Sequence, residues 1–323
     1  MRIRKSDFKP AWWLRGAHQQ TTWATFFRKI SGLDLTKERL ELNDGDFLDL
    51  VWTGSENGEI VLILHGLEGS KDSPYAKGIM QTLSDAGFRC CLMHFRGCSG
   101  EQNRLSRSYH SGDTGDLQQV VDHIQKHHPQ KIFAAIGYSL GGNALLKWMG
   151  EKGDDAEVTT AVGVSIPFTL NDAAERMSKG LSRTYEKHLV SQLQEKYRQK
   201  FSGIPSPLDI EIDKMKTFYL FDDQVIAPLH GFKDVHDYYK QSSCAQYLLH
   251  ISKPTLIIHA EDDPFMWPDT VPAENELSPD VQLELSKKGG HVGFINGSVP
   301  WKPVYWLDTR ILEWLSSQKT DSN

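Results

Sequence analysis

The order of apolar and polar positions along the chain predicts a fold in which strands and helices alternate. From residue 36 to residue 52, apolar positions alternate with charged ones on either side of Asn43-Asp44-Gly45, which predicts a β-hairpin. Continuous apolar runs then predict buried strands over residues 59–64, 89–95, 132–136, 158–166, 254–259 and 281–285. Helical periodicity predicts helices over residues 73–86, 114–127, 143–149 and 305–314. This alternation indicates a doubly wound, mostly parallel sheet that helices cover on both faces.

The alternation breaks at Pro167, after which residues 168–250 are polar and mainly helical in pattern. One apolar stripe recurs there at every fourth position, formed by Tyr185, Leu189, Leu193, Tyr197 and Phe201. We expect a helical cap inserted over the carboxyl edge of the sheet, where open α/β sheets bind ligands. The alternative is a set of extra helices on the side of the sheet. The predicted parts are an N-terminal arm (1–35), a core (36–167 and 251–318) and the cap (168–250), in one catalytic domain overall.

Composition and charge matter mainly for the classes that they exclude. The 323 residues are 39% hydrophobic and 24% charged, and a net charge of -6 argues against a nucleic-acid partner. No apolar run is long enough to cross a bilayer, and the basic N-terminus lacks the apolar core of a signal peptide. The four cysteines, Cys90, Cys91, Cys98 and Cys244, form no CxxC pair, which indicates free thiols in a reducing cytoplasm. No ligand cluster at metal spacing is visible, so we expect no metal and no cofactor.

The strongest chemical signal is a serine between a predicted strand and a predicted helix. Gly137-Tyr138-Ser139-Leu140-Gly141 follows the apolar run 132–136 at once and leads into the helix at 143–149. Strand, G-x-S-x-G and helix are the parts of a nucleophile elbow, a sharp turn that lifts the serine oxygen above the sheet. Small residues flank the serine because chain segments crowd the turn. The alternative is a glycine-rich turn with a solvated serine.

A serine hydroxyl is a weak nucleophile until a base accepts its proton, and we expect His291 to be that base. Of the 13 histidines, it directly follows the last predicted strand, in a loop whose glycines allow the imidazole to turn inward. His110, His230 and His259 are competitors, but none of them follows that strand. A solvated loop histidine is the alternative for His291.

The acid that orients the imidazole is expected in Glu261-Asp262-Asp263-Pro264, at the end of the preceding strand. We prefer Asp263 because the following proline makes it the start of a turn, and Asp262 is the alternative. The order Ser139, Asp263, His291 is that of α/β-hydrolases. All three residues follow strands of one sheet, so their side chains can converge. The oxyanion hole would then use the backbone N–H groups of Leu140 and, from the loop after residues 59–64, Leu67.

These residues resemble the YheT-type branch of the α/β-hydrolases, a family of bacterial esterases, over almost the whole chain. That family is related to membrane-anchored lipid hydrolases of animals, whose N-terminal anchor is not expected here, and to ester synthase/esterases of yeast. The motifs that carry the resemblance are Ala17-His18-Gln19-Gln20-Thr21, His65-Gly66-Leu67-Glu68-Gly69-Ser70, Arg96-Gly97-Cys98-Ser99-Gly100, residues 137–142, Phe221-Asp222-Asp223, Asp237-Tyr238-Tyr239 and Gly290-His291-Val292-Gly293. The resemblance implies hydrolysis of short- or medium-chain acyl esters or monoacylglycerols.

Three functions are considered for the chain, which we expect in the cytoplasm with a small-molecule ester as its partner. The first is a serine carboxylesterase that forms an acyl-enzyme on Ser139. The second is an acyltransferase that passes the acyl group to an alcohol. The third is an idle hydrolase fold used for binding, against which the intact serine, acid and histidine argue. The aromatic residues of the arm, Trp12, Trp13, Trp23, Phe26 and Phe27, fit simple packing, an acyl-chain pocket or a peripheral membrane contact.

Overall fold

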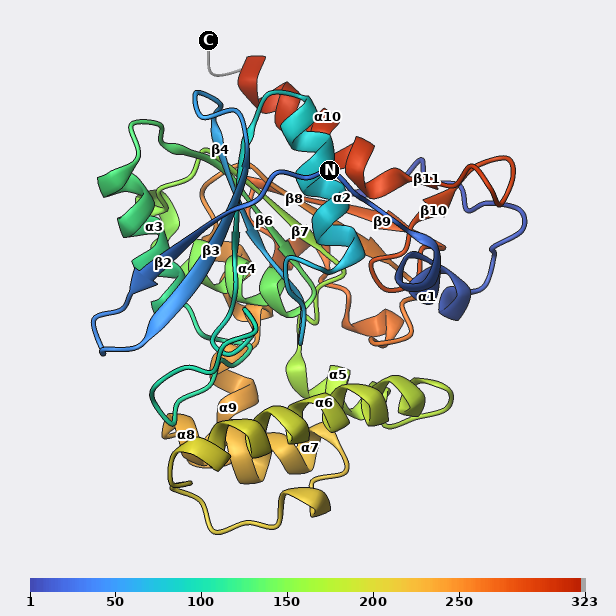
Figure 1. Cartoon of the computed structure of the whole chain (residues 1–323). Helices are drawn as coiled ribbons and strands as arrows, with labels where there is room; N and C mark the ends of the chain where they lie inside the picture. Colours follow the sequence, from blue (N-terminus) through green and yellow to red (C-terminus); the bar gives the residue numbers. More distant parts are fainter. Residues whose placement is uncertain (321–323) are drawn as a thin grey trace.

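The computed structural model describes residues 1–320 and is built around a nine-stranded sheet (Figure 1). The strand order is β1-β9-β8-β7-β6-β4-β5-β3-β2, and only the pairs β2–β3 and β3–β5 are antiparallel. The strands are β1 (Ile3–Lys5), β2 (Thr36–Glu41), β3 (Phe47–Gly54), β4 (Ile60–Leu64), β5 (Arg89–Met93), β6 (Ile132–Tyr138), β7 (Thr160–Val164), β8 (Thr255–Ala260) and β9 (Val281–Ser286). The predicted hairpin and the six predicted inner strands are therefore present.

Helices cover both faces of this sheet because the inner strands are apolar on both sides. Helices α2 (Pro74–Asp85) and α10 (Trp306–Thr320) pack on one face, and α3 (Gly115–His127) and α4 (Leu140–Lys152) on the other. Every residue of β4 and β6 is buried, as expected for strands between two helical layers. The protein therefore has two hydrophobic cores, one on each side of the sheet.

Residues 170–242 form a separate helical layer, which lies below the sheet in Figure 1. Its helices are α5 (Leu170–Met177), α6 (Ser182–Gly203), α7 (Phe218–Phe221), a π-helical turn η3 (Asp222–Ile226), α8 (Ala227–His230) and α9 (Val235–Ser242). These helices share a small hydrophobic cluster of their own. Phe168, Cys244 and Leu248, near the two ends of residues 168–250, belong instead to the core on the side of the sheet that α3 and α4 cover. We keep the name cap for residues 168–250 as our proposed division of the chain.

The N-terminal arm contains two elements that the apolar pattern does not predict. Strand β1 pairs in parallel with β9. Helix α1 (Ala17–Phe27) contacts the last strands of the chain, where the N–H of Ile295 donates to the side chain of Gln20. Those last strands form a second sheet of two short strands, β10 (Ile295–Asn296) and β11 (Val304–Tyr305). Short 3₁₀ turns complete the fold: η1 (Gly153–Asp155), η2 (Ile212–Lys214), η4 (Cys244–His250), η5 (Pro268–Thr270) and η6 (Glu274–Glu276). Over residues 1–320, none of the helices has the length and apolar character that crossing a membrane requires.

Candidate active site

Ser139 lies in a sharp turn between β6 and α4. Its backbone is strained, with φ 50° and ψ -118°, and glycines on both sides make the turn possible. A Cβ on Gly137 would lie 2.5 Å from the Cα of Gly142, and one on Gly141 would lie 2.4 Å from the carbonyl oxygen of His65. The sequence therefore forces the serine side chain out of the strand and places it at the N-terminus of a helix, where N–H groups favour negative charge.

The structure brings Ser139, His291 and Asp263 together in one chain of hydrogen bonds. His291 Nε2 lies 3.0 Å from Ser139 Oγ, and His291 Nδ1 lies 2.8 Å from Asp263 Oδ2. Because a carboxylate only accepts, Nδ1–H donates to Asp263, and this leaves Nε2 free to accept from the serine hydroxyl. The other Asp263 oxygen accepts from the N–H of Phe265 at 2.8 Å, and the Phe265 ring stacks on the imidazole with centroids 4.0 Å apart. The arrangement can remove the serine proton.

Asp262, the alternative acid, has a different set of partners. Its Oδ1 accepts from the N–H of Gly290 at 3.0 Å, and its Oδ2 lies 3.6 Å from Lys288 Nζ. Burial raises its pKa above the ordinary value. Asp262 therefore holds the backbone of the loop that carries His291, whereas Asp263 holds the imidazole itself.

The competing histidines lie elsewhere: His259 is buried, and His110 and His230 are half-buried. The rings of His110 and His230 pack edge to face with centroids 4.5 Å apart, and burial lowers their pKa values to about 3 and about 2. His259 lies in β8 against Phe168, and burial lowers its pKa to about 4. Within residues 1–320, the histidine hydrogen-bonded to Ser139 is His291.

The two predicted oxyanion-hole residues, Leu67 and Leu140, line the same pocket as Ser139. Leu140 is the first residue of α4, where an N–H group has no partner inside its own helix. The loop of Leu67 is held by His65, whose Nδ1–H donates to the carbonyl oxygen of the next residue at 2.7 Å. His65 Nε2 in turn accepts from the N–H of Phe95 at 3.2 Å, and burial lowers the His65 pKa to about 3, so the ring stays neutral.

Two tyrosines and one lysine fix the rest of this loop. Tyr75 accepts from the N–H of Gly66 at 2.8 Å, and Tyr109 accepts from the N–H of Glu68 at 3.0 Å. The Glu68 carboxylate then accepts from the Tyr109 hydroxyl at 2.7 Å and lies 3.1 Å from Lys196 Nζ, on α6 of the cap. The predicted oxyanion loop is therefore tied to the cap as well as to the core.

Helix α1 holds the other side of the site, and sequence reasoning missed this role. Thr21 Oγ1 accepts from the backbone N–H of His291 at 2.9 Å. Gln20 is fully buried: its amide nitrogen donates to the carbonyl oxygens of Leu14 (2.7 Å) and Ile295 (3.0 Å), and its oxygen accepts from the N–H of Ile295 at 2.6 Å. A Cβ on Gly290 would lie 2.4 Å from a carbonyl oxygen of α1, so helix and loop touch backbone to backbone. The available signal was the motif at residues 17–21.

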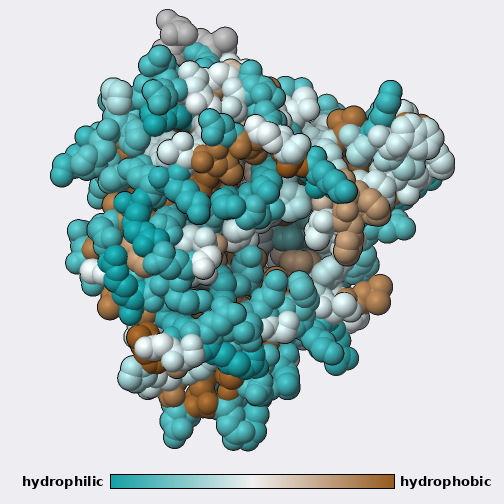
Figure 2. Space-filling model, viewed as in Figure 1, coloured by the Kyte–Doolittle hydropathy of each residue, from teal (hydrophilic) through white to brown (hydrophobic). Residues whose placement is uncertain are grey.

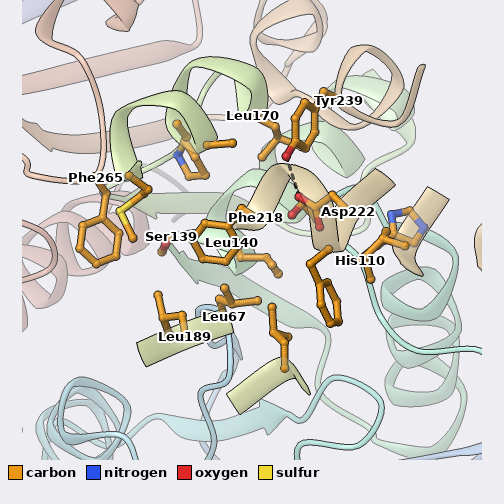
Figure 3. Close-up of a pocket in the computed structure, with 18 of the residues that line it drawn as sticks. Leu67, His110, Ser139, Leu140, Leu170, Leu189, Phe218, Asp222, Tyr239 and Phe265 are labelled. Carbon is orange, nitrogen blue, oxygen red and sulfur yellow. Dashed lines mark hydrogen bonds between the residues drawn. The ribbon is translucent and has the colours of Figure 1, made fainter. Parts of the chain in front are cut away.

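Two apolar hollows meet at Ser139. The first, which we name the inner pocket, lies between the sheet and the cap, encloses about 810 Å³ including its opening, and includes Leu140, Leu170 and Phe218 (Figure 3). The second, the outer groove, has about 1470 Å³ including the open space at its mouth and is lined by residues of α1, α2 and α6 as well as by His291. Figure 2 shows the surface hollowed between the region of α1 and the cap. A long, mostly apolar molecule can therefore lie across Ser139, with one part in the inner pocket and the other in the outer groove.

One group of side chains in the described residues could hold a metal ion, and it lies outside this site. The ligand atoms of Glu38, His123 and His128 lie within 4.8 Å of one another, and none of these residues lines either hollow. The Glu38 carboxylate already accepts hydrogen bonds from His123 and Trp52, both at 2.6 Å. Sequence spacing could not reveal the group because Glu38 is far along the chain from the histidines.

The chain is similar to known proteins in sequence and in fold. The family model described as the alpha/beta hydrolase fold matches residues 59–298. An Escherichia coli (strain K12) protein named "Putative esterase YheT" is 40% identical over 319 residues, covering 97% of this chain and 94% of that protein. The human protein named "Phospholipase ABHD3" is 26% identical over 310 residues, covering 92% of this chain and 76% of that protein. The solved structure of "Alpha/beta hydrolase GrgF" from Penicillium sp. sh18 has a TM-score of 0.61 and 17% identity, covering 88% of this chain and 99% of that chain.

The chain therefore belongs to the α/β-hydrolase family, as the matched family model shows. Within that family it is an esterase/lipase-type hydrolase, and the predicted resemblance to the YheT-type branch is confirmed by the E. coli relative. The predicted fold class is confirmed as well, since the sheet is mostly parallel and the solved neighbours are α/β hydrolases.

Proposed function

We propose that the protein is a serine carboxylesterase that hydrolyses short- to medium-chain acyl esters, including monoacylglycerols, through Ser139, His291 and Asp263. The observation that carries this proposal is the unbroken hydrogen-bond chain from Ser139 Oγ to His291 (3.0 Å) and from His291 to Asp263 (2.8 Å). The position of that chain at the junction of two apolar hollows supports an apolar ester as substrate.

The reaction would follow two steps of acyl transfer. Ser139 Oγ attacks the ester carbonyl while His291 Nε2 takes its proton, and Asp263 stabilises the imidazolium that forms. The carbonyl oxygen becomes an oxyanion, which accepts hydrogen bonds from the N–H groups of Leu67 and Leu140, each worth on the order of 3 kcal/mol. The ester C–O bond breaks, and His291 returns the proton to the leaving alcohol. Water, activated by the same imidazole, then releases the acid and regenerates Ser139.

The two hollows suggest where each half of the ester binds. His291 lines the outer groove and not the inner pocket, and it must protonate the leaving oxygen. We therefore assign the alcohol half to the outer groove. The acyl chain would extend under the cap, between apolar side chains such as Leu170 and Phe218.

The surroundings of the outer groove support contact with a lipid surface. Phe26 lines the groove, and Phe26 and Phe27 are 70% and 60% exposed. Aromatic side chains of this kind favour the membrane interface. We also propose a cytoplasmic location, which the four free, buried cysteines support because a reducing compartment keeps thiols unpaired.

A chain-length series of p-nitrophenyl esters tests the proposed function. Wild-type protein should hydrolyse these esters, and Ser139→Ala should lower kcat by about 10⁶-fold because the three residues act as a unit. Added ethanol or glycerol separates hydrolysis from acyl transfer, since a transferase would form a new ester and a hydrolase only the free acid. An unchanged rate in Ser139→Ala would exclude Ser139 as the nucleophile.

A further inference from the structure

The end of the inner pocket far from Ser139 carries a carboxylate in an otherwise largely apolar lining. Asp222, Tyr239 and His110 lie together on one side of the pocket in Figure 3, and Ser139 and Phe265 lie on the other. A pocket for plain alkyl chains needs no charged group at this point. Placing a carboxylate there is costly unless hydrogen-bond partners compensate for the lost water, so the presence of Asp222 requires an explanation.

Asp222 has one hydrogen-bond donor among the described residues. Its Oδ2 accepts from the Tyr239 hydroxyl at 2.7 Å, and no other hydrogen bond reaches the carboxylate within residues 1–320. A carboxylate has room for about four donors, so acceptor capacity remains towards the pocket. Burial raises the pKa of Asp222 to about 7, which reflects how little compensates its charge.

A purely structural role in this turn belongs to the neighbouring Asp223 and therefore does not explain Asp222. Asp223 Oδ1 accepts from the N–H of Val235 at 3.2 Å and so ties the π-helical turn η3 to the start of α9. Asp222 stands at the first position of the same turn but lines the pocket. Such π-helical turns occur often at functional sites, because the wider turn redirects a side chain.

A hydrogen-bond donor lies at the same end of the pocket. His110 Nδ1 accepts from the N–H of Gly112 at 3.2 Å, which places the ring proton on Nε2. Burial lowers the His110 pKa to about 3, so the ring is neutral and keeps one donor. Its ring packs edge-on against Tyr238, whose own hydroxyl accepts from the N–H of Ser111 at 3.0 Å. The pocket lining therefore contains an acceptor, Asp222, and a neutral histidine that carries one ring N–H, His110.

We infer that Asp222 is a specificity site that accepts a hydrogen bond from a hydroxyl group on the acyl chain, so that hydroxyacyl esters are preferred substrates. This inference rests on the proposed esterase function and on the assignment of the acyl chain to the inner pocket. A hydroxyl fits this carboxylate, because it donates a hydrogen bond that the remaining lone pairs of Asp222 can accept. An acyl chain that ends in a methyl group at this point would displace water from the Asp222 carboxylate without replacing the lost hydrogen bonds.

The test compares p-nitrophenyl esters of ω-hydroxyalkanoates with the unsubstituted esters, from butanoate to dodecanoate. At pH 8, above the Asp222 pKa of about 7, and at the chain length that reaches Asp222, wild-type kcat/KM should favour the hydroxylated ester by roughly ten- to hundredfold, as expected for a hydrogen bond to a charged group. Asp222→Leu should abolish that preference and improve turnover of the plain ester. Asp223→Asn is the matched control, since it removes a charge from the same turn and should keep the preference.

A binding measurement separates this inference from the proposed function. Calorimetry on the Ser139→Ala protein should give a lower Kd for the methyl ester of the preferred ω-hydroxyalkanoate than for its unsubstituted counterpart. Equal turnover and equal Kd for both series, in an enzyme whose plain-ester activity depends on Ser139, would overturn the hydroxyl site and leave the esterase standing. Plain-ester activity that survives Ser139→Ala would instead overturn the proposed function.

Discussion

At the scale of single residues, the adjacent aspartates after β8 show how one position decides a chemical role. The carboxylate of Asp263 is buried and contacts the imidazole of His291, whereas the carboxylate of Asp262 accepts from the backbone N–H of Gly290, the residue before His291. The sequence motif contains both, so spacing alone could not choose between them. The choice depends on which side chain points into the site, which only the turn after the strand determines.

Replacing each aspartate by asparagine separates the two roles. Asp263→Asn should lower kcat by roughly 10⁴-fold, because an amide no longer stabilises the imidazolium or fixes its tautomer. Asp262→Asn should have a far smaller effect, since an amide oxygen can still accept from the N–H of Gly290. Steady-state kinetics on one ester measures both. A larger loss in Asp262→Asn than in Asp263→Asn would contradict the assignment.

The raised pKa of Asp222, about 7, makes a prediction about stability and pH. Between about pH 4 and pH 7 the folded protein keeps a proton that the unfolded chain has lost. The free energy of unfolding therefore falls as pH rises through this window, and Asp222→Asn removes that loss. Urea unfolding should show that the free energy of unfolding of the variant, relative to wild type, is higher at pH 8 than at pH 5 by on the order of 1–3 kcal/mol. A difference that does not change with pH would be inconsistent with the raised pKa of Asp222.

At the scale of elements, the apolar pattern predicted the sheet well and the N-terminal arm poorly. Strands β4 and β6 are buried on both faces, so their apolar runs mark them clearly. Strand β1 has only three residues, two of them charged, and carries no such pattern. Helix α1 reverses the usual rule: its buried residue is Gln20, while Phe26 and Phe27 are exposed. Hydrophobic periodicity therefore could not reveal α1, because the helix is held by hydrogen bonds to the loop that it supports.

The contact between α1 and the His291 loop should influence catalysis more than binding. Thr21→Val removes the acceptor for the N–H of His291 and should lower kcat roughly ten- to hundredfold through a displaced imidazole, with little change in KM. Thr21→Ser keeps the hydroxyl and should restore most of the rate. Kinetics of the two variants side by side provide the measurement, and equal rates would show that this hydrogen bond does not position the histidine.

At the scale of the whole molecule, the site exists because three separate parts of the chain meet over one edge of the sheet. The core supplies Ser139, Asp263 and His291, the arm supplies α1, and the cap supplies the wall of the inner pocket that faces the sheet. Lys196 links cap and oxyanion loop through Glu68. The sequence could predict the core because it follows a periodic pattern, but contacts between the parts depend on single polar side chains that no pattern marks.

Filling one hollow at a time tests the proposed division of the ester between them. Ala173 lines the inner pocket, so Ala173→Phe should shift the preferred substrate towards shorter acyl chains. Ala24 lines the outer groove, so Ala24→Phe should disfavour bulky alcohols and leave the acyl preference unchanged. The specificity profiles of both variants against acyl and alcohol series are the readout. If Ala24→Phe instead changed the acyl preference and Ala173→Phe the alcohol preference, the acyl chain would bind in the outer groove.

The most direct measurement of the central claim is the site of covalent labelling by an alkyl fluorophosphonate, mapped by mass spectrometry of peptides. The account predicts a single adduct on Ser139, no adduct in Ser139→Ala, and much slower labelling in His291→Ala, because the imidazole must accept the serine proton. An adduct on another residue, or labelling at an unchanged rate without His291, would contradict it.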